Sequence, residues 1–251
     1  MKNSGFLLTE LIKRDFLKRY KRTALGLLWS VLSPLLLLLV MNYVFSFFFS
    51  KDIEHYPIYL FSGFVQYQFF QSTTIGAIPV LYNSSVIYTK INVNKLLFIA
   101  SNNVAYLISY IVTLTIYFVF VAMDGIAITI SFLSLLWPVA FLVIITFSVS
   151  VILSTLNVFI SDIKYVYTVA ARILLYASGV FYDVTQLPIH IQKIMSFNPL
   201  YLSIEYFRQV VIYGHVPDVE YHFYMILYCM GILAFSLIIF GVMEKKFYKY
   251  V

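Results

Sequence analysis

Charged residues are scarce in this sequence. They make up 11% of its 251 residues, whereas 62% are hydrophobic, and a typical soluble domain has about 25% charged residues. Residues 23–50 contain no charge at all, although about 20 apolar residues already cross a bilayer. The stretch is also longer than the apolar region of a signal peptide, which has roughly 7 to 15 residues. The sequence therefore predicts a membrane protein.

Groups that would supply energy for transport are also missing. None of the nine glycines is followed by lysine, which excludes a Walker A loop, whose glycine-rich backbone and lysine hold the phosphates of ATP. The apolar stretches have no acid away from their ends, and proton coupling normally uses a titratable group in mid-membrane. The single cysteine, Cys229, is interpreted as a small buried hydrophobe. We expect no catalytic residue, metal ion or cofactor on this chain.

The apolar pattern predicts an all-α membrane protein with six spans. They cover residues 23–50, 57–81, 97–122, 130–159, 168–187 and 221–243. An even number of spans places both termini on the same side. Most Lys and Arg residues then fall in or beside cytoplasmic segments, with Lys51, Lys193 and Arg208 as the exceptions. Because positive residues stay inside, both termini are predicted to be cytoplasmic, and the net charge of +6 needs no nucleic acid to explain it.

Residues 1–22 are predicted to form a separate amphipathic helix before the permease domain of residues 23–251. At helical spacing of i+4, one stripe consists of Leu8, Ile12, Phe16 and Tyr20. Basic residues occupy much of the remaining surface, namely Lys13, Arg14, Lys18, Lys21 and Arg22. This distribution is typical of a helix that lies on a membrane surface.

The outer connection between the last two spans, residues 188–220, contains two short apolar pieces. Residues 189–197 and 200–213 are separated by Asn198-Pro199, which favours two helices with a break. Charges interrupt both pieces, so neither spans. Two interpretations stay open: helices that dip into the outer leaflet and return, or an ordinary extracellular loop. The i,i+3 spacing of Glu205 and Arg208 favours a structural ion pair over catalysis.

Aromatic residues are abundant, with 22 Tyr and 24 Phe. Most are expected to contact lipid or to form interfacial belts. Flat aromatic faces with polar neighbours also suit sugar rings. Candidates for such contacts are Trp29, Tyr67, Phe70, Tyr176, Phe181 and Tyr182.

Two predicted inner loops, residues 83–95 and 157–164, are short and polar with apolar tips at Val86, Ile87 and Ile163. They are read either as plain connectors or as plugs for a cleft on a cytoplasmic partner.

Four groups of residues together resemble a known family. They are Arg19-Tyr20, Thr23, Leu25-Gly26, Trp29 and Pro34-Leu35; then Asn83, Val86-Ile87, Lys90 and Lys95; then residues 156–159 with Asp162-Ile163; and finally Asn198-Pro199-Leu200, Arg208 and Gly214. In this order they resemble the type 2 ABC-transporter permeases that export lipid-linked polysaccharides such as O-antigen, capsule and wall teichoic acid. Gly179 stands where that family has a Ser-Pro pair, so a break in the fifth span is expected to be less rigid.

The resemblance implies a homodimer that pairs with two copies of a separate ATPase subunit, which binds ATP and Mg. It implies a bacterial inner-membrane location and a lipid-linked glycan as substrate, with O-antigen favoured. Residues expected to couple to the ATPase are Lys18, Arg22, Asn83, Val86, Ile87, Lys90, Asp162, Ile163 and Lys164. The six aromatic candidates would face the glycan channel, and the outer gate would contain Asn198, Pro199, Glu205 and Arg208.

Two alternatives remain at this point. One is a type 2 ABC permease for a small drug or a lipid, in which the aromatic residues would only face membrane lipid. The other is a membrane-embedded enzyme that modifies glycans through Glu205 and the outer histidines. The four histidines are scattered, however, and have no metal-ligand spacing.

Overall fold

The computed structural model describes residues 4–20, 28–49, 53, 55–91 and 93–250, and across these residues the fold is helical with no strand. This confirms the predicted all-α class. The helices are α1 Ser4–Tyr20, α2 Leu28–Phe49, α3 Tyr56–Ala77, α4 Val80–Asn83, α5 Ser85–Tyr88, α6 Leu96–Met123, α7 Leu136–Asn157, α8 Ile163–Tyr176, α9 Ile189–Met195, α10 Pro199–Val211 and α11 Val219–Glu244, with 3-10 turns η1 Ile130–Leu135, η2 Val184–Gln186 and η3 Phe247–Lys249.

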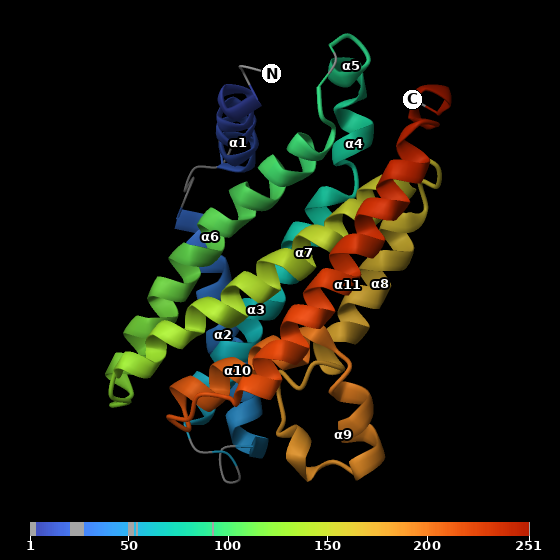
Figure 1. The fold of residues 1–251 in the computed structure, drawn as a ribbon. Helices are drawn as coiled ribbons and strands as arrows, with labels where there is room; N and C mark the ends of the chain where they lie inside the picture. The colour runs from blue at the N-terminus through green and yellow to red at the C-terminus, as the bar shows by residue number, and fades with distance from the viewer. Residues whose placement is uncertain (1–3, 21–27, 50–52, 54, 92, 251) are drawn as a thin grey trace.

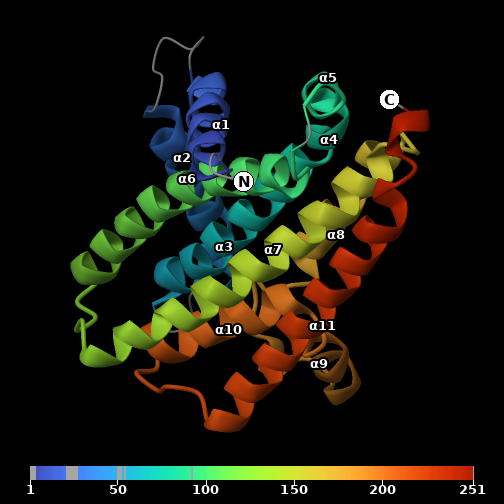
Figure 2. The same ribbon diagram turned by 45° about the horizontal axis from the view of Figure 1, so that its top comes forward.

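The long helices form a bundle with two distinct ends (Figure 1). Helices α1, α4 and α5 lie at one end together with the C-terminal turn, and α9 and α10 lie at the other. The rotated view in Figure 2 keeps α4, α5 and the C-terminus together. Helix α1 and the C-terminal turn therefore lie at the same end of the bundle. We call this the inner end and the opposite one the outer end.

Helix α3 lies in the middle of the bundle. It carries no charged residue and is buried along nearly its whole length, including Tyr56, Leu60, Phe64 and Phe70. A helix that is apolar all round must be surrounded by protein or lipid. Here it packs against α6, α7 and α10 in the main hydrophobic core.

Three helical segments in the described chain are long and apolar enough to cross a membrane. They are Leu96–Met123, Ile130–Asn157 and Val219–Glu244, close to the predicted spans 97–122, 130–159 and 221–243. In Ile130–Asn157, 56% of an apolar 18-residue stretch is buried inside the protein, whereas the buried share is 22% in each of the other two segments. The segment formed by η1 and α7 is therefore central, while α6 and α11 turn most of their side chains outward.

The predicted fifth span, residues 168–187, is wrong in its second half. Helix α8 begins earlier, at Ile163, but ends at Tyr176. Its 14 residues reach about 21 Å, less than the roughly 30 Å hydrocarbon core. Gly179 adopts a left-handed conformation with φ of 62°, which a helix cannot continue through. Apolar composition alone did not reveal this interruption.

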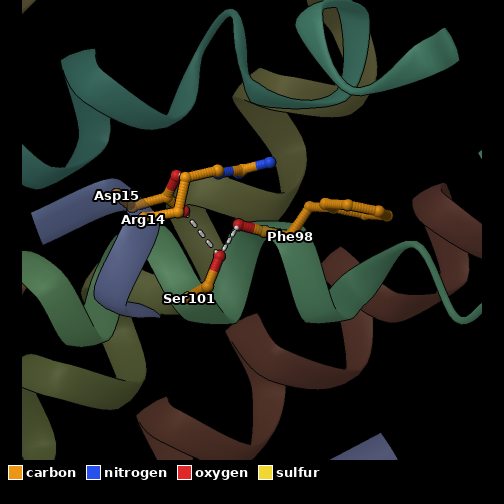
Figure 3. A network of polar contacts seen from close by, with 4 residues as sticks. All are labelled: Arg14, Asp15, Phe98 and Ser101. Carbon is orange, nitrogen blue, oxygen red and sulfur yellow. Dashed lines mark hydrogen bonds and ion pairs between the residues drawn. The ribbon is translucent and has the colours of Figure 1, made fainter. Parts of the chain in front are cut away.

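The packing face of α1 also differs from the predicted stripe. Leu11 is 5% exposed and packs with Tyr88 and Phe98, with Leu7 beside them. Asp15 continues this i+4 series, and its Oδ2 accepts a hydrogen bond from the Ser101 hydroxyl at 2.8 Å (Figure 3).

Ile12 and Phe16, in the predicted stripe, are only half-buried. The stripe was predicted to face a membrane, and that stays a prediction; the side of α1 that packs on protein lies one position earlier along the helix. The face that contains Leu7, Leu11 and Asp15 contacts α6 and the first inner loop. The pattern of apolar residues in α1 does not contain this information.

Close contact between α3 and α6 depends on a missing side chain at Gly76. A Cβ atom there would lie 2.7 Å from Cζ of Tyr106. We expect Gly76→Ala to lower the free energy of unfolding by about 1 to 3 kcal/mol, because the end of the Tyr106 side chain must leave its packed position. Thermal unfolding in detergent measures this. Gly231→Ala is the matched control, since a Cβ at that position meets nothing within 4 Å. Equal stability of the two variants would contradict the prediction.

Candidate functional site

Residues 177–183, which we call the α8–α9 turn, interrupt the helical backbone in the outer half. At membrane depth, such backbone is tolerated only where its polar groups find partners in protein or water. Side chains of α3 and α10, and the residue before α10, provide these partners. Carbonyl oxygens that accept their hydrogen bonds belong to Ala177, Gly179, Val180, Phe181 and Tyr182.

Arg208 of α10 is the central donor. Its side chain is fully buried. Nη1 donates to the Gly179 carbonyl and to the Tyr59 hydroxyl, both at 2.8 Å, and Nη2 donates to the Val180 carbonyl at 3.0 Å. A further, longer bond of 3.3 Å joins Nη2 to the Tyr59 carbonyl. One guanidinium thus connects α10, α3 and the α8–α9 turn.

The charge of Arg208 is stabilised without a carboxylate. No acid lies within ion-pair distance of it in the described chain. Glu205 instead accepts a hydrogen bond from Gln209 at 3.3 Å, so the predicted Glu205–Arg208 ion pair is wrong. The guanidinium carbon lies 3.4 Å from the centre of the Tyr59 ring, and cation–π attraction strengthens when the pair is desolvated. Carbonyl dipoles and this ring replace the counter-ion.

Two tyrosines on one face of α3 complete the support of the turn. Tyr56 donates to the Phe181 carbonyl at 3.2 Å, and Tyr59 donates to the Tyr182 carbonyl at 2.9 Å. The Tyr59 hydroxyl therefore both accepts from Arg208 and donates to the turn. The sequence places the two tyrosines on one face of α3, because they are three residues apart. It does not identify their partners, which are more than a hundred residues away along the chain.

Asn198 connects the two ends of the outer segment. Its Oδ1 caps α10 by accepting from the Leu200 N–H at 2.9 Å, as an N-cap asparagine commonly does. Its Nδ2 donates to the Ala177 carbonyl and to the Ser178 hydroxyl, both at 2.9 Å. The predicted pair of short helices with a break at Asn198 is confirmed. Asn198, which lies at the break between α9 and α10, therefore also holds the end of α8.

The aromatic candidates for substrate contact fall into two groups. Tyr67, Phe70 and Phe181 are buried inside the chain, and Tyr67 donates to the Ala171 carbonyl at 2.8 Å. These three cannot touch a substrate in this conformation. Trp29 and Tyr176 are exposed and Tyr182 is half-buried, as are the outer-gate residues Pro199 and Glu205.

The predicted coupling residues lie at the inner end, apart from the side chain of Lys18 and the whole of Arg22, which fall outside the described part. Exposed members are Asn83, Val86, Lys90, Asp162 and Lys164, while Ile87 and Ile163 are half-buried. Val86 is 63% exposed at the tip formed by α4 and α5. Ile87 turns inward against the cluster that contains Leu11 and Tyr88. One apolar tip is therefore available to a partner and the other holds the loop in place.

Histidines and acids of the outer half do not gather into one site. His55 contacts Asp124, and both ring nitrogens of His222 are engaged, by the Tyr206 hydroxyl and the Asp218 carbonyl. Within the described ranges, no three His, Cys, Asp or Glu residues are placed to hold a metal ion. What the arrangement provides is a supported turn rather than reactive groups.

Replacing Arg208 tests the support of the turn. We expect Arg208→Met to lower stability by about 3 kcal/mol, because buried carbonyl groups would lose their donors. For a protein of this size that corresponds to a fall in unfolding temperature of about 6 to 12 °C. Thermal unfolding in detergent measures it, with the exposed Arg172→Met as control. A wild-type melting temperature for Arg208→Met would contradict the assignment.

Comparison with known proteins agrees with this architecture. The family described as ABC-2 type transporter matches residues 7–212. Two O-antigen export system permease proteins RfbA of Klebsiella pneumoniae are 27% and 25% identical, each over 98% of this chain and 96% of the relative. An RfbA of the same description from Myxococcus xanthus is 25% identical over 85% of this chain and 83% of its own. Because the family match covers most of its length, this chain belongs to the ABC-2 type transporter family, as a multi-pass permease of the inner membrane.

Proposed function

We propose that this chain is the membrane-channel subunit of an ATP-driven exporter of lipid-linked cell-surface polysaccharide, with O-antigen as the favoured substrate. The observation that carries the substrate class is the similarity over 98% of the chain to relatives named O-antigen export permeases. Capsule and teichoic acid precursors share the lipid-linked glycan chemistry. The subunit itself performs no catalysis, and ATP and Mg bind to a partner ATPase.

The proposed topology has six crossings with cytoplasmic termini. Crossings are made by α2, α3, α6, η1 with α7, α8 with its turn, and α11. Residues 1–22 form the interface helix and residues 23–251 the permease domain. Helix α10 re-enters the outer leaflet, which is supported by its burial against α3 and α7 and by the Arg208 contacts. Lipid surrounds the outward faces of α6 and α11.

Two copies of the chain would enclose the passage. Support comes from α8, whose apolar side chains remain exposed in the protomer at Tyr165, Val169, Ile173 and Tyr176. Their spacing of i+4, i+4 and i+3 places them along one face of the helix. A second copy, with the glycan between the two, would cover this face next to the turn that Arg208 supports. Tyr176 then offers an exposed ring at the edge of the passage.

Docking of an ATPase subunit is assigned to the inner end, where the Val86 tip and Lys90, Asp162 and Lys164 are exposed. Permeases of this family work with a separate ATPase.

We expect Val86→Asp to abolish recovery of the ATPase encoded beside this chain, because a charge would enter the partner's apolar cleft. Co-purification from membranes measures this. Ile189→Asp is the control, since Ile189 is similarly exposed but lies on α9 at the outer end. Undiminished recovery with Val86→Asp would remove the docking role.

Deletion of the gene tests the substrate. Loss of surface glycan, restored by the wild-type chain, is expected, and intact surface glycan would refute the proposal.

Tyr176→Ala then separates a glycan from a small drug or lipid as cargo. We expect Tyr176→Ala to assemble normally with the ATPase but to export less glycan, because stacking on an exposed ring is lost. Export at the wild-type rate would favour the small-molecule alternative.

The enzyme alternative receives no support from a specific contact. In the described chain no hydrogen bond joins Glu205 to His222, since Glu205 contacts Gln209 and His222 contacts Tyr206. Glu205→Ala with unchanged glycan structure would remove it.

A further inference from the structure

The six residues after α11, Lys245–Tyr250, fold back against the inner end instead of leaving it. Phe247 is fully buried. Its ring lies 6.0 Å from that of Phe240 in an edge-on arrangement and 5.8 Å from that of Phe159. The Tyr250 ring meets Phe159 edge-on at 4.8 Å. The tail is therefore packed against Phe159, at the start of the second inner loop.

The last residue of α11 contacts the other inner loop. Glu244 pairs with Lys95, with 2.7 Å between Nζ and Oε1. The Lys95 side chain is 8% exposed, and its Nζ lies 5.4 Å from the ring centre of Tyr88 and 5.3 Å from that of Tyr248. Tyr88 belongs to α5 and Tyr248 to the tail. Lys95, which ends the first inner loop, is thus held jointly by the loop and by the C-terminal segment.

A shared hydrophobic cluster completes the connection. Leu81 of α4 and Val158 after α7 are buried in one cluster with Phe240 and Phe247. The backbone N–H of Leu81 also donates to the hydroxyl of Ser154 in α7 at 3.2 Å. Helix α4, which leads into the first inner loop, therefore shares one core with the second inner loop and the tail, and this core is separate from the main core of the bundle.

Membrane insertion alone does not account for these contacts. Positive residues at a cytoplasmic terminus follow from topology, and that explains Lys245 and Lys246. It does not require a buried phenylalanine or a nearly buried ammonium. The packing of Phe247 on Phe159 and the ion pair of Glu244 with Lys95 both connect the tail to the inner loops, where the proposed function places the ATPase.

We propose that residues 244–250 form a brace that joins the two inner loops into one unit, so that a movement imposed on one loop by the ATPase is passed to the other. The inference rests on the proposed function, because it assigns a role within ATPase coupling. Lys95, Glu244 and Phe247 are positioning residues: they touch neither nucleotide nor substrate and act through the loops. Each exported glycan then requires both loops to move together.

The test uses the complete exporter, with the chain and its ATPase reconstituted in lipid vesicles and lipid-linked glycan as substrate. For Phe247→Ala, we expect the ATPase to bind and hydrolyse ATP while glycan exported per ATP falls by about tenfold, within the usual range of coupling energies between sites. Phe235→Ala is the matched control, because it makes the same truncation on an exposed position of α11. Unchanged export per ATP in Phe247→Ala overturns the brace, and so does loss of ATPase binding, which would make the tail a docking surface.

The ion pair gives a second test that does not depend on packing. Lys95→Glu and Glu244→Lys are each expected to lower export per ATP, and the double variant, with the charges exchanged, is expected to recover most of it. No recovery in a double variant that still binds the ATPase overturns the pairing. Failure of the proposed function is distinguishable, because the wild-type chain would then neither recover an ATPase nor export glycan. If the wild-type exporter works and the variants export as much glycan per ATP as it does, the brace is refuted while the proposed function stands.

Discussion

The carbonyl groups left without helical partners where α8 ends are the constraint on which the outer half depends. An interruption of a helix at membrane depth is stable only if other parts of the protein satisfy the exposed backbone. Arg208, Asn198 and two tyrosines of α3 do so. Their contacts fix α10 inside the bundle. Gly63 permits this approach, because a Cβ there would lie 3.0 Å from Nη2 of Arg208.

The two ends of the bundle solve different physical problems. At the outer end, donors converge on backbone, which holds a non-helical turn and a short helix in place. At the inner end, short loops are fastened from behind by apolar side chains and an ion pair, while Val86 stays exposed. This arrangement is compatible with the docking proposed for the inner end, because a partner can contact the exposed tip while the loop behind it is held in place.

Much of the architecture was predictable because hydrophobic length and charge are local properties. Three spans, the break at Asn198 and the exposed apolar tip at Val86 follow from stretches that can be read one at a time. The features that the sequence did not reveal have a common cause. Tyr67 and Phe181 have the composition of a sugar-binding surface, but their burial depends on which helices lie against them. The same holds for Leu11, since only the position of α6 decides which side of α1 is the docked face.

The sequence by itself determined that the chain lies in a membrane and that it contains no Walker A sequence, since hydrophobic length is sufficient for the first and the absence of a Gly-Lys pair for the second. Only the tertiary structure decided the partners of Arg208 and Lys95. Arg208 is three residues from Glu205, yet it bonds to carbonyls 28 and 29 residues away. Lys95 pairs across 149 residues with Glu244. A buried charge takes whatever partner the fold brings near it, and spacing along the chain does not contain that information.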